Sequence, residues 1–290
     1  MSQASLVAVV GPTAAGKSAL AMDLAARLGA EIVNADAFCL YRGMDIGTAK
    51  PSPADRAAIR HHVIDTHEVS DDVDVATYQQ MARAAIEDIT GRGVPAILVG
   101  GSGLYVQAVL DDLRFPGTDP EIRARLEAEL ALLGPEPLHE RLAQIDPAAA
   151  AQILATNGRR IVRALEVNEF TGQSFTATLN PNTVWRPSTR LGWDPGAEIV
   201  DARIEARIHQ MWADGFPEEV RRLAPRMGRT ASRAVGYRQL LEDPESAREA
   251  TILATRQLSR RQRRWFRRDA RIQPVETTAQ ALAILGNLET

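Results

Sequence analysis

The sequence predicts an α/β fold in which a parallel sheet is flanked by helices and interrupted by an all-helical insertion domain. Short apolar runs alternate with helical patterns over the first part of the chain, and this alternation is typical of a three-layer parallel sheet. A glycine-rich loop follows the first apolar run. Between about residues 120 and 181, only helical patterns occur and no strand is needed.

The glycine-rich loop, GPTAAGKS, matches the pattern G-x-x-x-x-G-K-[ST] at each fixed position. An apolar run at residues 6–10 precedes it and a helical pattern at residues 19–28 follows, which is the context that this phosphate-loop (P-loop) pattern requires. Its glycines let backbone N–H groups turn toward an anion, and the start of the helix adds partial positive charge. Lys17 adds a full charge, and the Ser18 hydroxyl can ligate magnesium. We therefore predict a P-loop-type sheet with a polyphosphate site formed by Gly11, Pro12, Thr13, Ala14, Ala15, Gly16, Lys17 and Ser18.

Composition limits the possible functions. The hydrophobic content of 45% suffices for a buried core, and the formal net charge of −3 excludes a generally basic nucleic-acid binder but not a local basic patch. Cys39 is the only cysteine, which excludes an intrachain disulfide and a cysteine-built zinc site. The five histidines show no metal-binding spacing. The N-terminal apolar run is expected to be a core strand and not a signal peptide, and no apolar run approaches the roughly 18 residues of a membrane span. We expect a soluble, cytoplasmic protein.

Further strands are expected at residues 31–35, 62–65, 96–99 and 191–193. Ligands of parallel sheets bind beyond the carboxyl ends of the strands. The phosphate loop, Asp36 and residues 100–103 all follow such ends, so we expect them to converge on one site.

Helices are expected at residues 76–91, 121–133, 138–145, 159–170, 201–223, 246–271 and 276–290, and Asp146 is expected to cap a helix that begins at Pro147. We expect a catalytic core formed by residues 1–116 and 188–290, and a helical insertion at residues 117–187.

Two groups beside the phosphate loop are candidates for chemistry. Asp36 could hold magnesium, take a proton from an attacking group, or only cap the next turn. The glycines of residues 100–103 allow close backbone approach and Ser102 offers a hydroxyl, although a tight strand–helix turn is the alternative. The strand at residues 96–99 ends in glycine, whereas a P-loop ATPase usually has an acidic residue there to hold magnesium. This difference disfavours an ATPase.

Arginine dominates the segment from residue 256 to residue 271. On a helix of ~100° per residue the eight arginines fall within an arc of roughly 160°, while Leu258, Trp265 and Phe266 lie outside it and can pack inward. A face of one sign indicates a nucleic-acid surface, with a solvated face as the alternative. The eight are Arg256, Arg260, Arg261, Arg263, Arg264, Arg267, Arg268 and Arg271.

Two smaller basic groups occur elsewhere. Arg159, Arg160 and Arg163 begin a helix of the insertion. Arg203 and Arg207 are four residues apart and therefore share a helix face, where they could clamp phosphates or pair with neighbouring glutamates.

Taken together, these segments resemble the tRNA dimethylallyltransferases. The resemblance rests on the phosphate loop, on Asn34-Ala35-Asp36, and above all on YRGMDIGTAKP at residues 41–51. The segments VGGSGLY, RALEV, TRQ, RQ and WFR follow in family order, so that the match runs from Val9 to about Arg268.

The resemblance implies transfer of a dimethylallyl group from its diphosphate to N6 of the adenosine immediately 3′ of the anticodon, with magnesium as cofactor. It implies that the phosphate loop binds the prenyl diphosphate and that Asp36 is the base that takes the amine proton. It implies that Ser102, where the family usually has threonine, reaches the bridging oxygen or the tRNA. Arg207, with Arg203 as second choice, is expected to contact the diphosphate. Because no phosphoryl group moves, no acidic strand end is required.

The resemblance also implies a tRNA partner whose anticodon stem is gripped by the helical insertion and whose target base is flipped out of its loop. We expect no membrane partner and a monomer. The residues expected to contact tRNA are Asp36, Ala37, Phe38, Cys39, Ser102, Arg123, Arg159, Arg160, Ile161, Val162, Arg163, Arg256 and Arg264.

One segment departs from the family pattern. The family usually reads Asp-Ser-Met-Gln or Asp-Ala-Met-Gln, whereas this chain has Asp36-Ala37-Phe38-Cys39. The glutamine amide that can read a base edge is missing, and cysteine is a weak donor. We therefore expect a relaxed tRNA preference. Two alternatives stay open: a P-loop kinase of a small metabolite, and a non-catalytic RNA-binding module with a vestigial phosphate loop.

Overall fold

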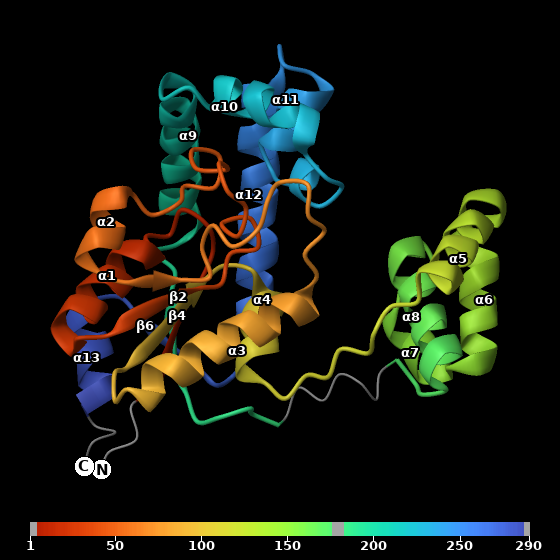
Figure 1. Cartoon of the computed structure of the whole chain (residues 1–290), viewed down its shortest axis with the longest axis horizontal. Coiled ribbons are helices and arrows are strands. Elements are labelled where there is room, and N and C mark those ends of the chain that lie inside the picture. The colour runs from red at the N-terminus through yellow and green to blue at the C-terminus, as the bar shows by residue number, and fades with distance from the viewer. Residues whose placement is uncertain (1–4, 176–182, 287–290) are drawn as a thin grey trace. The chain divides into compact units, whose positions relative to one another are not determined.

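The computed structural model describes residues 5–175 and 183–286, and it divides the chain into two compact units (Figure 1). The core unit comprises Met1–Leu110 and Arg186–Thr290, and the helical unit comprises Asp111–Trp185. The sequence predicted these boundaries after residue 116 and before residue 188, which is six and two residues later than the boundaries in the structure.

The core unit contains one parallel sheet of six strands in the order β3-β2-β4-β1-β5-β6. The central strand, β1 (Leu6–Val10), is buried along its whole length, which explains its unbroken apolar sequence. Its neighbours are β4 (Ala96–Gly100) and β5 (Thr189–Trp193). The strands β2 (Glu31–Asn34), β3 (His61–His62) and β6 (Ile272–Val275) complete the sheet. The predicted α/β fold with a parallel sheet is confirmed.

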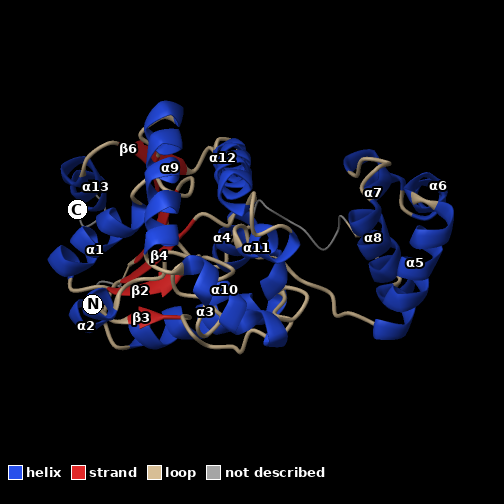
Figure 2. Cartoon of the chain, turned by 90° about the horizontal axis from the view of Figure 1, so that it is seen from above, coloured by secondary structure: helices blue, strands red, loops and turns tan. Residues whose placement is uncertain are grey.

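Helices cover both faces of the sheet (Figure 2). On one face, α1 (Lys17–Leu28) and α13 (Thr278–Gly286) pack together over the apolar side chains of Val7, Ile97 and Leu191. Successive side chains of a strand point to opposite faces, so Ala8 and Leu98 are buried on the other side. There α3 (Val75–Gly91) and α4 (Gly103–Leu110) pack against each other and against β4.

The second half of the core unit differs from the sequence expectation at three points. The single helix expected at residues 201–223 is two helices, α9 (Ala197–Ala213) and α10 (Phe216–Leu223), because Gly215 adopts a left-handed backbone between them. The helix expected to reach residue 271 ends earlier, since α12 (Ala247–Phe266) gives way to strand β6. Strand β6 was not predicted; its Pro274 is tolerated because it lies at the edge of the sheet.

Two short helices and two 3₁₀ turns complete the core unit. They are α2 (Pro53–Ala58), α11 (Tyr237–Glu242), Ala224–Arg226 and Ala231–Arg233. The last helix was expected to run to residue 290, but residues 287–290 lie outside the described part of the chain.

The helical unit contains α5 (Pro120–Leu133), α6 (Pro135–Ile145), α7 (Pro147–Gln152) and α8 (Gly158–Thr171) around its own apolar core. The predicted cap is confirmed: the Asp146 carboxylate accepts a hydrogen bond from the Ala149 N–H at 3.0 Å. Gly172, in the left-handed conformation, ends α8 where the sequence indicated. Residues 176–182, within the expected insertion, lie outside the described residues.

A buried glutamate fixes the long loop between β2 and α2. The Glu219 carboxylate, on α10, accepts hydrogen bonds from the N–H groups of Asp45, Ile46 and Gly47 at 3.0, 2.9 and 3.2 Å. It accepts a fourth from the Tyr237 hydroxyl. Only 4% of Glu219 is exposed, so these donors satisfy a charge that water cannot reach.

Glu219→Ala is expected to lower the free energy of unfolding by about 3 kcal/mol, because it leaves buried N–H groups without an acceptor. Urea unfolding measures the change. Glu218→Ala is the control, since Glu218 is exposed on the same helix turn and its replacement should change stability by less than about 0.5 kcal/mol. Equal effects of the two substitutions would contradict this role of Glu219.

Candidate active site at the carboxyl edge of the sheet

Three backbone turns meet beyond the adjacent strands β2, β4 and β1, as the sequence predicted. Gly100 lies so close to the β2 turn that a Cβ built on it would be 2.2 Å from the Ala35 carbonyl oxygen. A Cβ built on Gly101 would be 3.2 Å from the carbonyl oxygen of Gly11, in the phosphate loop. Gly100 therefore permits backbone packing that a side chain would prevent, and Gly101 permits a close approach of the β4 turn to the phosphate loop.

The phosphate loop is held from outside by β5 and α9. Its backbone turns at Ala14 and Gly16, which have φ values of +59° and +102°. The Ala15 carbonyl oxygen accepts hydrogen bonds from Trp193 Nε1 at 2.9 Å and from Arg203 Nη1 at 2.7 Å. Arg203, the second choice for an anion contact, thus supports the loop backbone.

Two enclosed cations lie within the electrostatic range of Asp36. Burial lowers the pKa of Lys17 to about 8, with the charge of Asp36 opposing this shift and that of Arg207 adding to it. Lys17 Nζ donates to the Pro12 carbonyl at 2.7 Å. Burial also lowers the pKa of Arg207, again against the charge of Asp36. Two partly buried cations near one carboxylate leave a net positive charge that an anion would stabilise.

Arg207 points into the phosphate loop. Its Nη2 donates to Thr13 Oγ1 at 3.0 Å, and its buried Nε has no hydrogen-bond partner within residues 5–175 and 183–286. A buried guanidinium N–H without an acceptor is costly, so this donor suits a bound anion. Arg207 fits the role predicted for it better than Arg203 does.

Asp36 is held just beyond the end of β2. Its N–H donates to Asn34 Oδ1 at 3.0 Å, and its Oδ1 accepts from the Phe38 N–H at 2.9 Å. The Asn34 amide in turn donates to the carbonyls of Asp36 and Val63. The capping role that the sequence left open is therefore present. It uses one carboxylate oxygen, and the other makes no hydrogen bond within the described part of the chain.

Ser102 lies at the start of α4, where its carbonyl accepts from the Val106 N–H at 3.0 Å. Its two glycine neighbours contact α12: a Cβ on Gly101 would be 2.8 Å from Gln262 Nε2, and a Cβ on Gly103 would be 2.4 Å from Trp265 Cδ1. The Ser102 turn is thus packed directly beneath α12.

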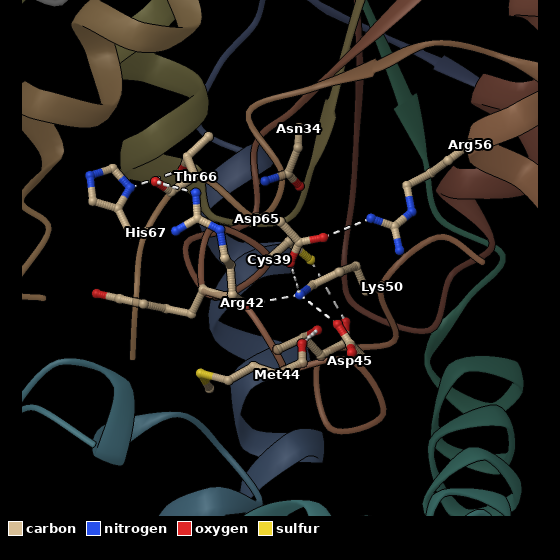
Figure 3. Close-up of polar contacts among 12 residues, drawn as sticks. Asn34, Cys39, Arg42, Met44, Asp45, Lys50, Arg56, Asp65, Thr66 and His67 are labelled. Carbon is tan, nitrogen blue, oxygen red and sulfur yellow. Dashed lines mark hydrogen bonds and ion pairs between the residues drawn. The ribbon is translucent and has the colours of Figure 1, made fainter. Parts of the chain in front are cut away.

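A network of charges shapes the segment that follows Asp36 (Figure 3). Lys50 Nζ, at 1% side-chain exposure, pairs with Asp65 at 2.6 Å and with Asp45 at 2.7 Å, and donates to the Tyr41 carbonyl at 2.8 Å. Asp65 also pairs with Arg56 at 2.7 Å. Lys50 is not among the residues predicted for the site, although its place within YRGMDIGTAKP is a usable signal.

Cys39 does not present its thiol to a ligand. The side chain is buried, its Sγ lies 4.0 Å from the Thr48 carbonyl oxygen, and burial raises the pKa of the thiol. The tRNA contact expected of Cys39 is therefore left to its backbone atoms and stays a prediction, whereas the side chains of Ala37 and Phe38 are partly exposed.

The arginine face of α12 is only partly open. Arg256, Arg260 and Arg263 pair with Glu205, Asp201 and Asp194, on α9 and just before it. These pairs leave Arg261 and Arg264 exposed, without an ion pair to any described residue. Trp265 was expected to pack inward, but 42% of its surface is exposed. The face of α12 that packs inward is instead lined by buried polar side chains, those of Thr251, Thr255, Ser259 and Gln262.

The basic patch of the helical unit also contains both ion-paired and exposed arginines. Arg123 and Arg163 both pair with the fully buried Glu166, and Arg163 also donates to the Pro116 and Gly117 carbonyls. Arg159 and Arg160 are exposed.

Ile161 and Val162 were expected to contact tRNA, but their side chains belong to the apolar core of the helical unit. Only their backbone atoms are left for such a contact.

Within the described residues, no cluster of three or more histidine, cysteine, aspartate or glutamate side chains is placed to hold a metal ion. The same residues contain no helix with the length and apolar character needed to cross a membrane.

Comparisons with known proteins agree with this geometry. A family model described as IPP transferase matches residues 39–269. The tRNA dimethylallyltransferase of Kineococcus radiotolerans is 56% identical over 282 residues, covering 92% of this chain and 89% of that protein. The protein of the same name from Salinispora arenicola is 54% identical over 287 residues, covering 96% and 84%.

The solved structures that this chain resembles are also tRNA prenyltransferases. The full-length tRNA isopentenylpyrophosphate transferase of Bacillus halodurans is 33% identical, with a TM-score of 0.70 over 98% of this chain and 95% of that one. A eukaryotic dimethylallyltransferase solved while acting on tRNA has a TM-score of 0.78 at 25% identity, over 90% of this chain and 70% of that one. A phosphate loop beside a strand-end aspartate, matched over most of the chain to these proteins, shows that this chain belongs to the IPP transferase family of tRNA dimethylallyltransferases.

Proposed function

We propose that this protein transfers a dimethylallyl group from dimethylallyl diphosphate to N6 of the adenosine immediately 3′ of the anticodon in tRNA. The observation that carries this proposal is the meeting of the Asp36 turn, the Ser102 turn and the phosphate loop, with Asp36 within electrostatic range of Lys17 and Arg207. The two cations suit a diphosphate leaving group, and Asp36 offers a carboxylate oxygen to an incoming nucleophile. Membership of the family supplies the substrate class.

The diphosphate would bind in the phosphate loop, among the inward-turned N–H groups and the start of α1. As the bond between the allylic carbon and the bridging oxygen breaks, negative charge grows on pyrophosphate. The Lys17 ammonium and the Arg207 guanidinium, both enclosed, stabilise that charge more strongly than solvated cations would. The allylic carbon becomes electrophilic as its leaving group departs.

The exocyclic amine of adenine is a weak nucleophile, because its lone pair is delocalised into the ring. As N6 forms its bond to the allylic carbon, one of its protons must leave. The Asp36 carboxylate has an oxygen without a hydrogen bond to any described residue, and Asn34 and the Phe38 N–H fix its orientation. Asp36 would take this proton as a general base, which contributes roughly 10²–10⁴-fold.

Magnesium fits this site as an ion that depends on the substrate. The Ser18 hydroxyl is exposed at the first turn of α1, and no group of three protein ligands is present within the described residues. Mg²⁺ usually keeps several waters and binds through few protein oxygens plus substrate phosphates. When bound, it would neutralise charge on the diphosphate. Ser18 would supply the protein ligand, and Asp36 would be kept for the proton.

The tRNA would meet exposed groups on both units. On the core unit these are the partly exposed Ser102 and Phe38 and the exposed Arg264, which has no ion pair within the described residues. Arg256, which pairs with Glu205, would have to exchange that partner for a phosphate. On the helical unit Arg159 and Arg160 are the exposed cations. We propose that Arg123 and Arg163 act there mainly through Glu166, which holds the start of α5 and the middle of α8 together. We also propose that the protein acts in the cytoplasm as a monomer.

Incubation with magnesium, dimethylallyl diphosphate and unmodified tRNA, followed by mass analysis of the digested nucleosides, is expected to show one dimethylallyl group added to adenosine. Asp36→Asn should lower the rate by at least about 100-fold with tRNA affinity retained, because the base is lost and the turn-capping oxygen is kept. Asp88→Asn, an exposed aspartate on α3, is the control and should retain full activity.

No product despite tight tRNA binding would instead favour the non-catalytic RNA-binding module. ATP turnover without tRNA would favour the kinase.

Arg207→Gln is expected to raise the KM for dimethylallyl diphosphate roughly 10- to 100-fold and to lower kcat, because a charge-assisted contact to the diphosphate is lost. Steady-state kinetics at saturating tRNA measure both values. Arg221→Gln, an exposed arginine on α10, should change neither. An unchanged KM in the Arg207 variant would show that this guanidinium does not bind the donor.

The absence of the family's glutamine predicts weak discrimination at the base that precedes the target adenosine. A bidentate amide contact to a base contributes about 1–3 kcal/mol, and Cys39 is buried against Thr48 and cannot replace it. Among tRNAs varied at that base, kcat/KM should therefore differ by less than about 10-fold. A sharp preference for one base would refute this expectation.

A further inference from the structure

Gln262, on the buried face of α12, contacts two of the turns that form the candidate active site, the phosphate loop and the turn after β4. Its Oε1 accepts a hydrogen bond from the Thr13 N–H, in the phosphate loop, at 2.8 Å. Its amide also packs on the bare backbone of Gly101, where a Cβ would be 2.8 Å from Nε2. Only 8% of Gln262 is exposed. This contact joins residues 249 positions apart in the sequence and is not part of the chemistry described above.

The contact restrains a part of the loop that the substrate would use. In a phosphate loop the backbone N–H groups turn toward the anion, so the orientation of the Thr13 peptide helps to define the diphosphate site. Thr13 is held twice, since its N–H donates to Gln262 and its Oγ1 accepts from Arg207. A shift of α12 along or around its axis would therefore move this peptide.

The other face of the same helix turn is available to RNA. Arg261 and Arg264 are exposed and lie within one turn of Gln262. At ~100° per residue, Gln262 points roughly opposite the middle of the arginine arc. The exposed Trp265 lies against Gly103 at the end of this helix. A polynucleotide held by this surface would act on a helix that contacts both turns of the active site from beneath.

We propose that Gln262 is a positioning residue that couples tRNA binding on α12 to the conformation of the phosphate loop, so that bound tRNA increases the affinity of the loop for the diphosphate. This inference rests on the proposed function, since it assigns the tRNA to the exposed face of α12. Coupling of two ligands is reciprocal, so the diphosphate must increase tRNA affinity by the same factor. The physical basis is that α12, once fixed by RNA, holds the Thr13 peptide in one orientation before the anion arrives.

The test measures inorganic pyrophosphate binding, with magnesium, in the absence and presence of unmodified tRNA. Pyrophosphate carries no prenyl group, so no turnover occurs during the titration. The wild-type protein is expected to bind pyrophosphate at least about 5-fold more tightly when tRNA is bound. Gln262→Met keeps the volume of the side chain and removes the hydrogen bond to Thr13. It should bring the ratio of the two affinities close to one.

Two further variants separate coupling from packing. Gln210→Met is the matched control, because Gln210 is exposed on α9 and its side chain donates to Asp214 Oδ1 at 2.7 Å, on the same helix end. It should keep the wild-type ratio. Gly101→Ala approaches the same contact from the opposite side, because its Cβ would displace the Gln262 amide. The φ value of Gly101 is not positive, so alanine introduces no backbone strain there, and this variant keeps the test valid if Gln262→Met fails to fold. It should lose the coupling as Gln262→Met does.

A ratio near one in the wild-type protein would overturn the proposal, and so would a Gln262→Met variant that folds and keeps the wild-type ratio. The proposed function is tested by a different experiment. It is contradicted if the wild-type protein adds no dimethylallyl group to tRNA, and the pyrophosphate titration does not depend on that result. Loss of coupling in both Gln262→Met and Gly101→Ala, with the control unchanged, supports Gln262 as the link between the two substrates.

Discussion

The backbone packing of three turns at the carboxyl edge of the sheet is the constraint on which the rest of this site depends. Gly100 brings the β4 turn against the Asp36 turn at a distance that leaves no room for a Cβ, and Gly101 brings the β4 turn close to the phosphate loop. This packing sets how far the carboxylate of Asp36 lies from the phosphate loop. A displacement needs its nucleophile and its leaving group on opposite sides of one carbon, and the base must reach the proton of the nucleophile, so that separation is a condition of the chemistry.

Buried charges maintain the same arrangement from further away. Glu219 fixes the middle of the loop after β2 through three N–H groups, and Lys50 closes the same loop onto Asp65. Neither group has a step in the proposed chemistry. Their burial makes each position specific, because a displaced carboxylate or ammonium would lose its partners without gaining water. Gln262 adds a link of the same kind between α12 and the phosphate loop.

The sequence was sufficient for the parallel sheet, the phosphate loop and the convergence of Asp36 with that loop, because these features follow from local patterns and from the geometry of parallel strands. It was insufficient where tertiary packing decides. Helical periodicity placed eight arginines on one face of a helix. It could not show that Arg256, Arg260 and Arg263 form ion pairs with acidic side chains on α9 and in the segment just before it. Nor could it indicate that Cys39 turns inward. Strand β6 was not predicted, because a strand of four residues that includes a proline shows little of the hydrophobic pattern typical of strands.

The most direct test of the account is a structure of the wild-type protein with magnesium, pyrophosphate and an unmodified tRNA anticodon stem–loop, in which no transfer can occur. We expect the adenine 3′ of the anticodon to be extruded and its N6 to lie about 2.6–3.2 Å from an Asp36 oxygen, with pyrophosphate in the phosphate loop. An adenine N6 directed at another group, or pyrophosphate bound outside the loop, would contradict the assignment of base and leaving-group site.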